Sequence, residues 1–294
     1  MVGALVRLMT AIITQFDENL EVDYEATRQL ASFLIENGSE GLVVCGTTGE
    51  SPTLTDEEKL KLFSAVQKEV GGKAHVWAGV GSNDTNHSVE LANEASKLGV
   101  YGVMAVAPYY NKPSQEGLYR HFKAIADTTS LPVMLYNIPG RSSVNILPET
   151  VARLSKIDNV VALKESSGSM DQLTQLKMLL PNDFIIFSGD DSLTLPMMAL
   201  GAQGVVSVAS HIIGKELNTM VYAFAEGRTE EALKIHLSLF DVFKTLFITT
   251  SPIPLKEALK MWGKSNGVLR LPLCEANEKE RQEIAQMMKN HGLI

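Results

Sequence analysis

The stretch Asn159–Gly168, NVVALKESSG, is a short apolar run that ends in a lysine and gives way to small polar residues. Val160–Leu163 is apolar at every position, which is typical of a strand covered on both faces, as in parallel sheets beneath helices. A lysine at the end of such a strand is partly desolvated. Desolvation favours the neutral amine, which attacks a ketone to form a Schiff base. For Lys164 alone, an ion pair with a carboxylate such as Glu165 is the better explanation, so the rest of the chain must decide.

The same kind of strand-like run recurs along the chain, and a helical pattern follows each one. Among these helices are those expected at 192–200 and 214–226, and one that begins after Thr55, where Glu58 three residues on completes a capping box. The eight runs lie at residues 8–14, 41–46, 75–80, 102–107, 132–136, 160–163, 184–187 and 204–208. Alternating strands and helices at this spacing, joined by short loops, predict a closed (β/α)8 barrel, the TIM-barrel fold, over residues 1–226. Only helical patterns occur in residues 227–294, the first of them at 229–246, which predicts a C-terminal helical extension packed on the barrel.

An open, doubly wound sheet is the alternative architecture for a chain of alternating strands and helices. Such a sheet would carry a glycine-rich dinucleotide fingerprint after its first strand, and none follows Thr14. The 294 residues could hold two average domains, but barrels of this kind routinely reach this size as one domain. The barrel is therefore the preferred interpretation.

Composition excludes several classes of partner. The formal net charge of -8 argues against binding to nucleic acid or to an anionic membrane, because either would need a basic face. Cys45 and Cys274 are the only cysteines, too few for a disulfide framework or a zinc cluster. Met1–Arg7 lacks the apolar core and cleavage pattern of a signal peptide, and no stretch reaches the roughly 18 apolar residues of a membrane span. We expect a cytoplasmic protein.

Reactive side chains stand where the predicted strands end, and in a (β/α)8 barrel these positions share one face. Along the chain they are Thr47, Thr48, Tyr109, Tyr110, Tyr136, Arg141, Lys164, Asp190 and Asp191. Each has a plain explanation on its own, such as a turn hydroxyl, an interface aromatic, a surface charge or a helix cap. Their shared location predicts a binding site.

The set suits a small 2-keto acid. Lys164 offers an amine for the carbonyl group, and the Thr48 hydroxyl with nearby backbone N–H groups offers donors for the carboxylate. Tyr136 offers a phenol for proton transfer, and Arg141 offers a bidentate site for a second carboxylate.

Metal and phosphate sites fit the sequence less well. The six histidines are scattered, with no pair at the spacing of metal ligands on a helix. The pair Asp190–Asp191 precedes a helical pattern and is explained by capping better than by Mg²⁺ binding. The loop Gly46–Gly49 has no P-loop lysine. We therefore expect neither a metal nor a cofactor.

Four ordered motifs resemble those of the pyruvate-dependent class I aldolases of the neuraminate lyase superfamily, and within it the dihydrodipicolinate synthase branch. They are GTTGES at 46–51, PYYNKP at 108–113, YNIPGR at 136–141 and KESSG at 164–168. The similarity covers nearly the whole chain and continues through SGDD at 188–191, GVVSV at 204–208 and PIPLK at 252–256.

The resemblance implies a role for each matching residue in the chemistry. Lys164 would form the imine with pyruvate, and Tyr136 would donate and accept protons. Thr47 would connect Tyr136 to Tyr110, whose counterpart in this family reaches into the site of a neighbouring subunit.

The resemblance also implies how the substrates bind. Thr48 and the backbone at Val206 would hold the pyruvate carboxylate, and Arg141 would bind the carboxylate of L-aspartate 4-semialdehyde. The implied product is 4-hydroxy-tetrahydrodipicolinate, on the diaminopimelate and lysine pathway. The family suggests a homotetramer built as a dimer of dimers, which the sequence does not distinguish from a dimer.

Other activities on the same scaffold are the main rivals. N-acetylneuraminate lyases typically carry Ser-Thr where Thr47-Thr48 stands and lack the arginine that corresponds to Arg141, and 2-keto-3-deoxygluconate aldolases vary at that arginine. Arg141 therefore favours the condensation with aspartate semialdehyde. A barrel retained only as a binding or scaffold protein is a third reading, and it predicts no imine.

Some positions depart from the family pattern. Gln15 replaces a usual proline, and Ser142-Ser143 replaces a common Thr-Gly; both lie outside the proposed chemistry. Lysine-sensitive members usually carry a histidine and a glutamate where this chain has Lys59 and His87, although Ser51, Asn83 and Tyr109 are retained. We expect weak or absent inhibition by lysine.

Overall fold

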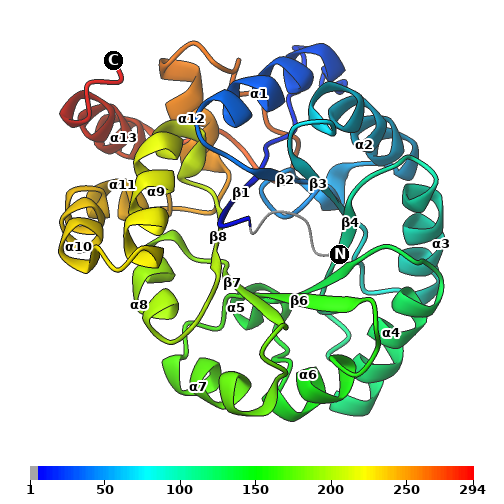
Figure 1. The fold of residues 1–294 in the computed structure, drawn as a ribbon. Helices are drawn as coiled ribbons and strands as arrows, with labels where there is room; N and C mark the ends of the chain where they lie inside the picture. The colour runs from blue at the N-terminus through cyan, green and yellow to red at the C-terminus, as the bar shows by residue number, and fades with distance from the viewer. Residues whose placement is uncertain (1–5) are drawn as a thin grey trace.

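The computed structural model describes residues 6–294; Met1–Leu5, part of the stretch considered above for a signal peptide, lie outside this range. Eight parallel strands pair in sequence order and close into a barrel, which confirms the predicted fold (Figure 1). β8 closes the ring on β1, with Leu8 opposite Val205. The strands are β1 (Leu8–Ala11), β2 (Gly41–Val44), β3 (His75–Gly79), β4 (Gly102–Val106), β5 (Val133–Asn137), β6 (Val160–Glu165), β7 (Ile185–Ser188) and β8 (Gly204–Ser207).

Helices surround the ring of strands (Figure 1). The Asp23 carboxylate caps α1, and the predicted capping box of Thr55 and Glu58 begins α2. The helices that follow the strands are α1 (Tyr24–Glu36), α2 (Asp56–Val70), α3 (Thr85–Ser96), α4 (Gln115–Asp127), α5 (Pro139–Ser142), α6 (Pro148–Leu154), α7 (Met170–Leu179), α8 (Thr194–Ala199) and α9 (Ser210–Ala225), with 3-10 turns η1 (Ser51–Thr53) and η2 (Asp191–Leu193).

Several boundaries differ from the sequence interpretation. The run expected at 8–14 forms a strand only over Leu8–Ala11. β6 continues through Glu165, so Lys164 lies within the strand and not after it. The helix expected at 192–200 begins with the 3-10 turn η2. α9 begins at Ser210 instead of residue 214, with a kink at Ile213, because the chain turns directly from β8 into the helix.

The C-terminal helices lie beside α8 and α9, outside the ring (Figure 1). They are α10 (Thr229–Ser238), α11 (Phe240–Thr245), α12 (Ile253–Met261) and α13 (Glu278–Asn290). The pattern at 229–246 forms two helices that meet at Leu239, not one. Among residues 6–294, no helix is both long and apolar enough to cross a membrane.

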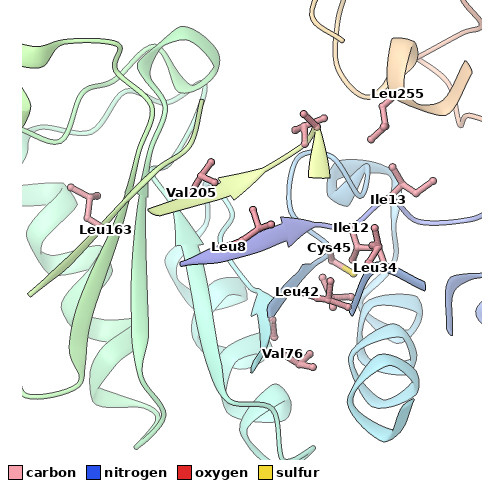
Figure 2. Close-up of a cluster of buried hydrophobic side chains, with 14 of the residues drawn as sticks. Leu8, Ile12, Ile13, Leu34, Leu42, Cys45, Val76, Leu163, Val205 and Leu255 are labelled. Carbon is pink, nitrogen blue, oxygen red and sulfur yellow. The ribbon is translucent and has the colours of Figure 1, made fainter. Parts of the chain in front are cut away.

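Alternation along the strands divides the core into two layers. Leu8, Leu42, Leu163 and Val205 belong to the layer between the barrel and its helices, part of which Figure 2 shows. Their strand neighbours fill the barrel interior: Met9, Val43, Met104, Met134, Tyr136, Ala162, Phe187 and Val206. Since side chains two apart on a strand share a face, Lys164 follows Ala162 into the interior.

Candidate active site

Lys164 and Tyr136 are neighbours across strands β6 and β5. They are direct partners in the strand register, and the Lys164 Nζ atom lies 4.3 Å from the centre of the Tyr136 ring. Only 4% of Lys164 and 3% of Tyr136 are exposed, so the amine and the aromatic ring lie together in the buried interior. The structure therefore brings together the two residues to which the sequence assigned the imine and the proton transfers.

The alternative explanation of Lys164 as a partner of Glu165 is wrong. Glu165 is the next residue on the strand and points away from the barrel interior. Its carboxylate accepts hydrogen bonds from the Ser167 N–H at 2.6 Å, Asn137 Nδ2 at 3.0 Å and Gln172 Nε2 at 3.2 Å. Glu165 thus fixes the chain that leaves β6, and its charge is satisfied without the lysine.

Gly189, directly after β7, makes room for the lysine. A Cβ atom added to Gly189 would lie 1.9 Å from Ser166 Oγ, 2.9 Å from Lys164 Cε and 3.1 Å from Lys164 Cγ. The Gly189 N–H also donates to the Glu165 carbonyl oxygen at 2.9 Å, so the backbone cannot easily move away. In the sequence Gly189 stands only as part of the SGDD motif at 188–191, without a role of its own; the distance across the strands reveals one.

The variant Gly189→Ala should therefore displace the Lys164 side chain. We expect a loss of about tenfold or more in the rate of imine formation with pyruvate, since misplacing a reacting group by about 1 Å can cost this much. Borohydride trapping at short times, followed by mass spectrometry, measures the rate. Gly72→Ala is the matched control, because a Cβ there meets no atom within 4 Å. Equal trapping rates in both variants would contradict this role.

Thr47 and Thr48 occupy a tight turn after β2. The Gly49 N–H donates to the Gly46 carbonyl oxygen, and the Glu50 N–H donates to the Thr47 carbonyl oxygen, both at 3.1 Å. The turn ends at Glu50, whose backbone is left-handed with a φ of 54°. A non-glycine residue in this conformation costs about 1–3 kcal/mol, so surrounding contacts must hold the turn in place.

A cavity of about 630 Å³ opens beside the turn, among the loops that follow β2, β3, β4 and β5. Thr47, Tyr109, Tyr136 and Arg141 line it, so the cavity reaches Tyr136, the strand partner of Lys164. Arg141 is exposed, and its Nη2 donates to the Ser251 carbonyl oxygen at 3.1 Å. A guanidinium at this position can bind a carboxylate that enters the cavity.

Val206 lies on β8 opposite Met9 of β1, in the same interior cluster as Tyr136. The chain after Val206 is held by Asp191, which is 2% exposed. The Asp191 carboxylate accepts hydrogen bonds from the N–H groups of Val208 at 3.1 Å and Ala209 at 3.0 Å. These bonds fix the backbone at the end of β8.

The neighbouring residues Asp190 and Asp191 have different structural roles. Asp190 is a cap, as expected, and accepts from the Ser192 N–H at 2.8 Å. Asp191 instead joins the β7 loop to β8, and burial raises the pKa of its carboxyl group, although hydrogen bonds from Ser207 and the backbone oppose this effect. Within residues 6–294, three or more His, Cys, Asp or Glu side chains do not gather in any group that could hold a metal ion.

Tyr110 does not line the cavity of its own chain. It is 89% exposed, and its backbone is left-handed with a φ of 72°. Tyr109, the preceding residue, turns toward the cavity instead. A single chain therefore does not form the link from Thr47 to Tyr110 that the resemblance implies.

Comparisons with known proteins agree on one family. The model of the dihydrodipicolinate synthetase family matches residues 4–291. A 4-hydroxy-tetrahydrodipicolinate synthase from Desulforamulus reducens is 56% identical over 289 residues, which cover 98% of each chain. The dihydrodipicolinate synthase structure from Bacillus anthracis superposes with a TM-score of 0.94 at 50% identity, covering 97% of this chain and 98% of that one. The structure from Cyanidioschyzon merolae, solved with lysine bound, has a TM-score of 0.97 at 45% identity and covers 99% of both chains. This chain belongs to the dihydrodipicolinate synthetase family.

Proposed function

We infer that this chain is a lyase that condenses pyruvate with L-aspartate 4-semialdehyde to give 4-hydroxy-tetrahydrodipicolinate, in lysine and diaminopimelate biosynthesis. The observation that carries this inference is the Lys164 amine, which is buried beside the Tyr136 ring. The chain that holds this pair matches a 4-hydroxy-tetrahydrodipicolinate synthase over 98% of its length. We also propose a role for each residue of the site.

The first half of the reaction takes place at Lys164. Its neutral amine attacks the pyruvate carbonyl carbon, the resulting carbinolamine loses water, and an imine forms. Loss of a proton from the methyl carbon then gives the enamine. Tyr136 is the group that moves these protons, because its phenol lies beside the amine and also borders the cavity.

The pyruvate carboxylate binds between the turn after β2 and the end of β8. Thr48 supplies a hydroxyl and the turn supplies N–H groups, while the Val206 backbone closes the other side. Hydrogen bonds fix both segments, which supports this placement. The Gly46–Gly49 turn is held by its own backbone hydrogen bonds, and the chain after β8 is held by the Asp191 carboxylate. A fixed set of donors favours a bound anion because it needs no reorganisation.

The second substrate binds through Arg141. The guanidinium stands exposed at the cavity and can hold the carboxylate of aspartate semialdehyde. The enamine then attacks the aldehyde, and the substrate's own amine displaces Lys164 from the imine. This transimination releases a cyclic product and restores the free lysine.

A two-stage experiment tests the proposed function. Incubation with pyruvate and borohydride, followed by mass mapping, should place one adduct on Lys164; an unmodified Lys164 would overturn the assignment. Turnover is then measured separately with aspartate semialdehyde, N-acetylneuraminate and 2-keto-3-deoxygluconate. We expect the first to react, and preferential turnover of either sugar acid would reassign the substrate.

We propose a homotetramer of paired dimers as the working assembly. Two surfaces support this proposal. Tyr110, 89% exposed, is free to enter the site of a second copy and to complete the link from Thr47. Exposed apolar side chains also lie on α10 and on two helices that contact it, namely Leu200 at the end of α8, Leu233 and Leu237 on α10 and Phe240 at the start of α11. Apolar clusters of this kind are typical of interfaces between subunits.

Lysine should be a poor inhibitor, and the structure supplies a reason. The Asp56 carboxylate at the cavity is already bound by His87 Nε2 at 2.8 Å and by Lys59 Nζ at 3.5 Å. The two ammonium groups of lysine would meet Lys59 and an occupied carboxylate. We expect submillimolar lysine to leave most of the turnover intact in a steady-state assay.

The double variant Lys59→His/His87→Glu is the matching test of this explanation. It restores the residue types that lysine-sensitive members usually carry, so it should gain inhibition by lysine. Half-inhibition of the parent by submillimolar lysine would show the explanation to be wrong.

A further inference from the structure

α12 carries a lysine that is fully buried. Lys256 is 0% exposed, and its Nζ atom donates to Glu50 Oε1 at 2.5 Å and to the Val268 carbonyl oxygen at 2.8 Å. The same atom lies 4.4 Å from the centre of the Phe16 ring. Burial lowers the pKa of Lys256, and the charge of Glu50 opposes this shift. The Lys256 ammonium and the Glu50 carboxylate thus form a buried ion pair in which each charge stabilises the other.

Glu50 is also the residue that ends the turn of Thr47 and Thr48. Its N–H donates to the Thr47 carbonyl oxygen at 3.1 Å, and its backbone adopts the left-handed conformation. Its second carboxylate oxygen, Oε2, accepts from the Arg270 N–H at 3.1 Å. Both oxygens of Glu50 are therefore tied to the C-terminal extension, and the turn after β2 is anchored there.

The same part of the extension reaches the other binding residue. The Ser251 carbonyl oxygen, which precedes α12, accepts a hydrogen bond from Arg141 Nη2 at 3.1 Å. Leu255 lies in the outer core layer with Ile13, just beyond β1, and Figure 2 shows the two in the same region. Ser251 and Lys256 therefore contact Arg141 after β5, Glu50 after β2 and Phe16 after β1, three places around the carboxyl end of the barrel.

A buried ion pair is a poor device for stability alone. Removing two charges from water costs about as much as their attraction returns, and apolar replacements of similar size are often as stable. Such a pair instead fixes geometry, because an ammonium with fixed partners can bind the carboxylate in only one position. At Glu50 that placement determines the position of a turn in an unfavourable backbone conformation.

We propose that Lys256 is a positioning residue for the reaction: through its buried pair with Glu50 it holds the Thr47–Thr48 turn where the pyruvate carboxylate binds. This inference rests on the proposed function, because it concerns the binding of pyruvate. Lys256 acts through Glu50 and the turn, and it does not touch the substrate.

The test compares three variants. Lys256→Met leaves Glu50 as a buried charge without its ammonium partner. Glu50→Gln/Lys256→Met removes both charges and so avoids that penalty. Glu257→Gln is the matched control on the same helix, because Glu257 faces Arg281 at 3.7 Å and not the turn. Thermal unfolding, steady-state kinetics and the pyruvate concentration for half-maximal borohydride trapping are measured for each.

We expect the double variant to fold with a melting temperature near that of the parent, yet to need about tenfold or more pyruvate for half-maximal trapping. The KM for aspartate semialdehyde should stay within about twofold. Glu257→Gln should match the parent in both. A loss of stability without any change in half-saturation is what a merely structural pair would produce.

The results distinguish failure of the proposed function from failure of the positioning role of Lys256. If the parent traps no pyruvate on Lys164, the proposed function fails. If the parent traps pyruvate and the folded double variant shows an unchanged half-saturation, the function stands and the positioning role is overturned. Should Lys256→Met not fold, the double variant still decides, because it carries no unpaired charge.

Discussion

The variant Lys164→Ala should form no borohydride-stable adduct with pyruvate, and its turnover should fall by at least about 10³-fold, because removing a covalent nucleophile removes the reaction path itself. The folded state should survive, since the charge of neighbouring Glu165 is satisfied by Ser167, Asn137 and Gln172. Intact-protein mass spectrometry after trapping measures the adduct, and thermal unfolding checks the fold.

Lys215→Ala is the control for this experiment. Lys215 lies on α9, is exposed, and belongs to no part of the site, so its variant should trap pyruvate as the parent does. A Lys164→Arg variant adds a second check, because arginine keeps the positive charge but stays protonated and forms no imine. Residual trapping in Lys164→Ala would mean that another amine carries the chemistry.

The variant Tyr136→Phe should separate imine formation from proton transfer. Its ring still fills the barrel interior, where Tyr136 packs with Met134 and Val206, so the fold and the Lys164 environment are preserved. Loss of the hydroxyl should slow turnover by about 10²-fold or more, the usual contribution of a general acid and base. That factor corresponds to about 2.7 kcal/mol of transition-state stabilisation.

Two measurements on Tyr136→Phe check this assignment. Trapping with pyruvate at long times should still label Lys164, while kcat in the full reaction should fall. Tyr119→Phe is the control, because Tyr119 lies on α4 beneath Arg153, on the outside of the barrel. If Tyr136→Phe turned over as fast as the parent, the phenol would have no part in the proton transfers.

The predicted architecture followed from local patterns. Short apolar runs such as Val160–Leu163 and caps such as Thr55 with Glu58 act within a few residues of one another, and the observed strands and helices reproduce them. Boundaries were less well predicted where tertiary contacts extended an element. β6 runs on through Lys164 and Glu165 because β5 and β7 both pair with it there.

The candidate site was predicted as a set of residues but not as a geometry. Strand ends share one face of a barrel, which was enough to group Thr47, Tyr136, Arg141 and Lys164. Their distances required the register between neighbouring strands, which sets Lys164 directly opposite Tyr136. The outward position of Tyr110 likewise emerged only from the folded chain.

The sequence by itself determined the eight repeated units, the reactive residues at their ends and the family they belong to, because periodicity, capping and motifs are carried by neighbouring residues. The tertiary structure alone decided that Gly189 must leave room for Lys164 and that Lys256 of the extension meets Glu50 across 206 positions of the chain. Such contacts exist only once the barrel closes and burial forces each polar group to find a partner, wherever in the sequence that partner lies.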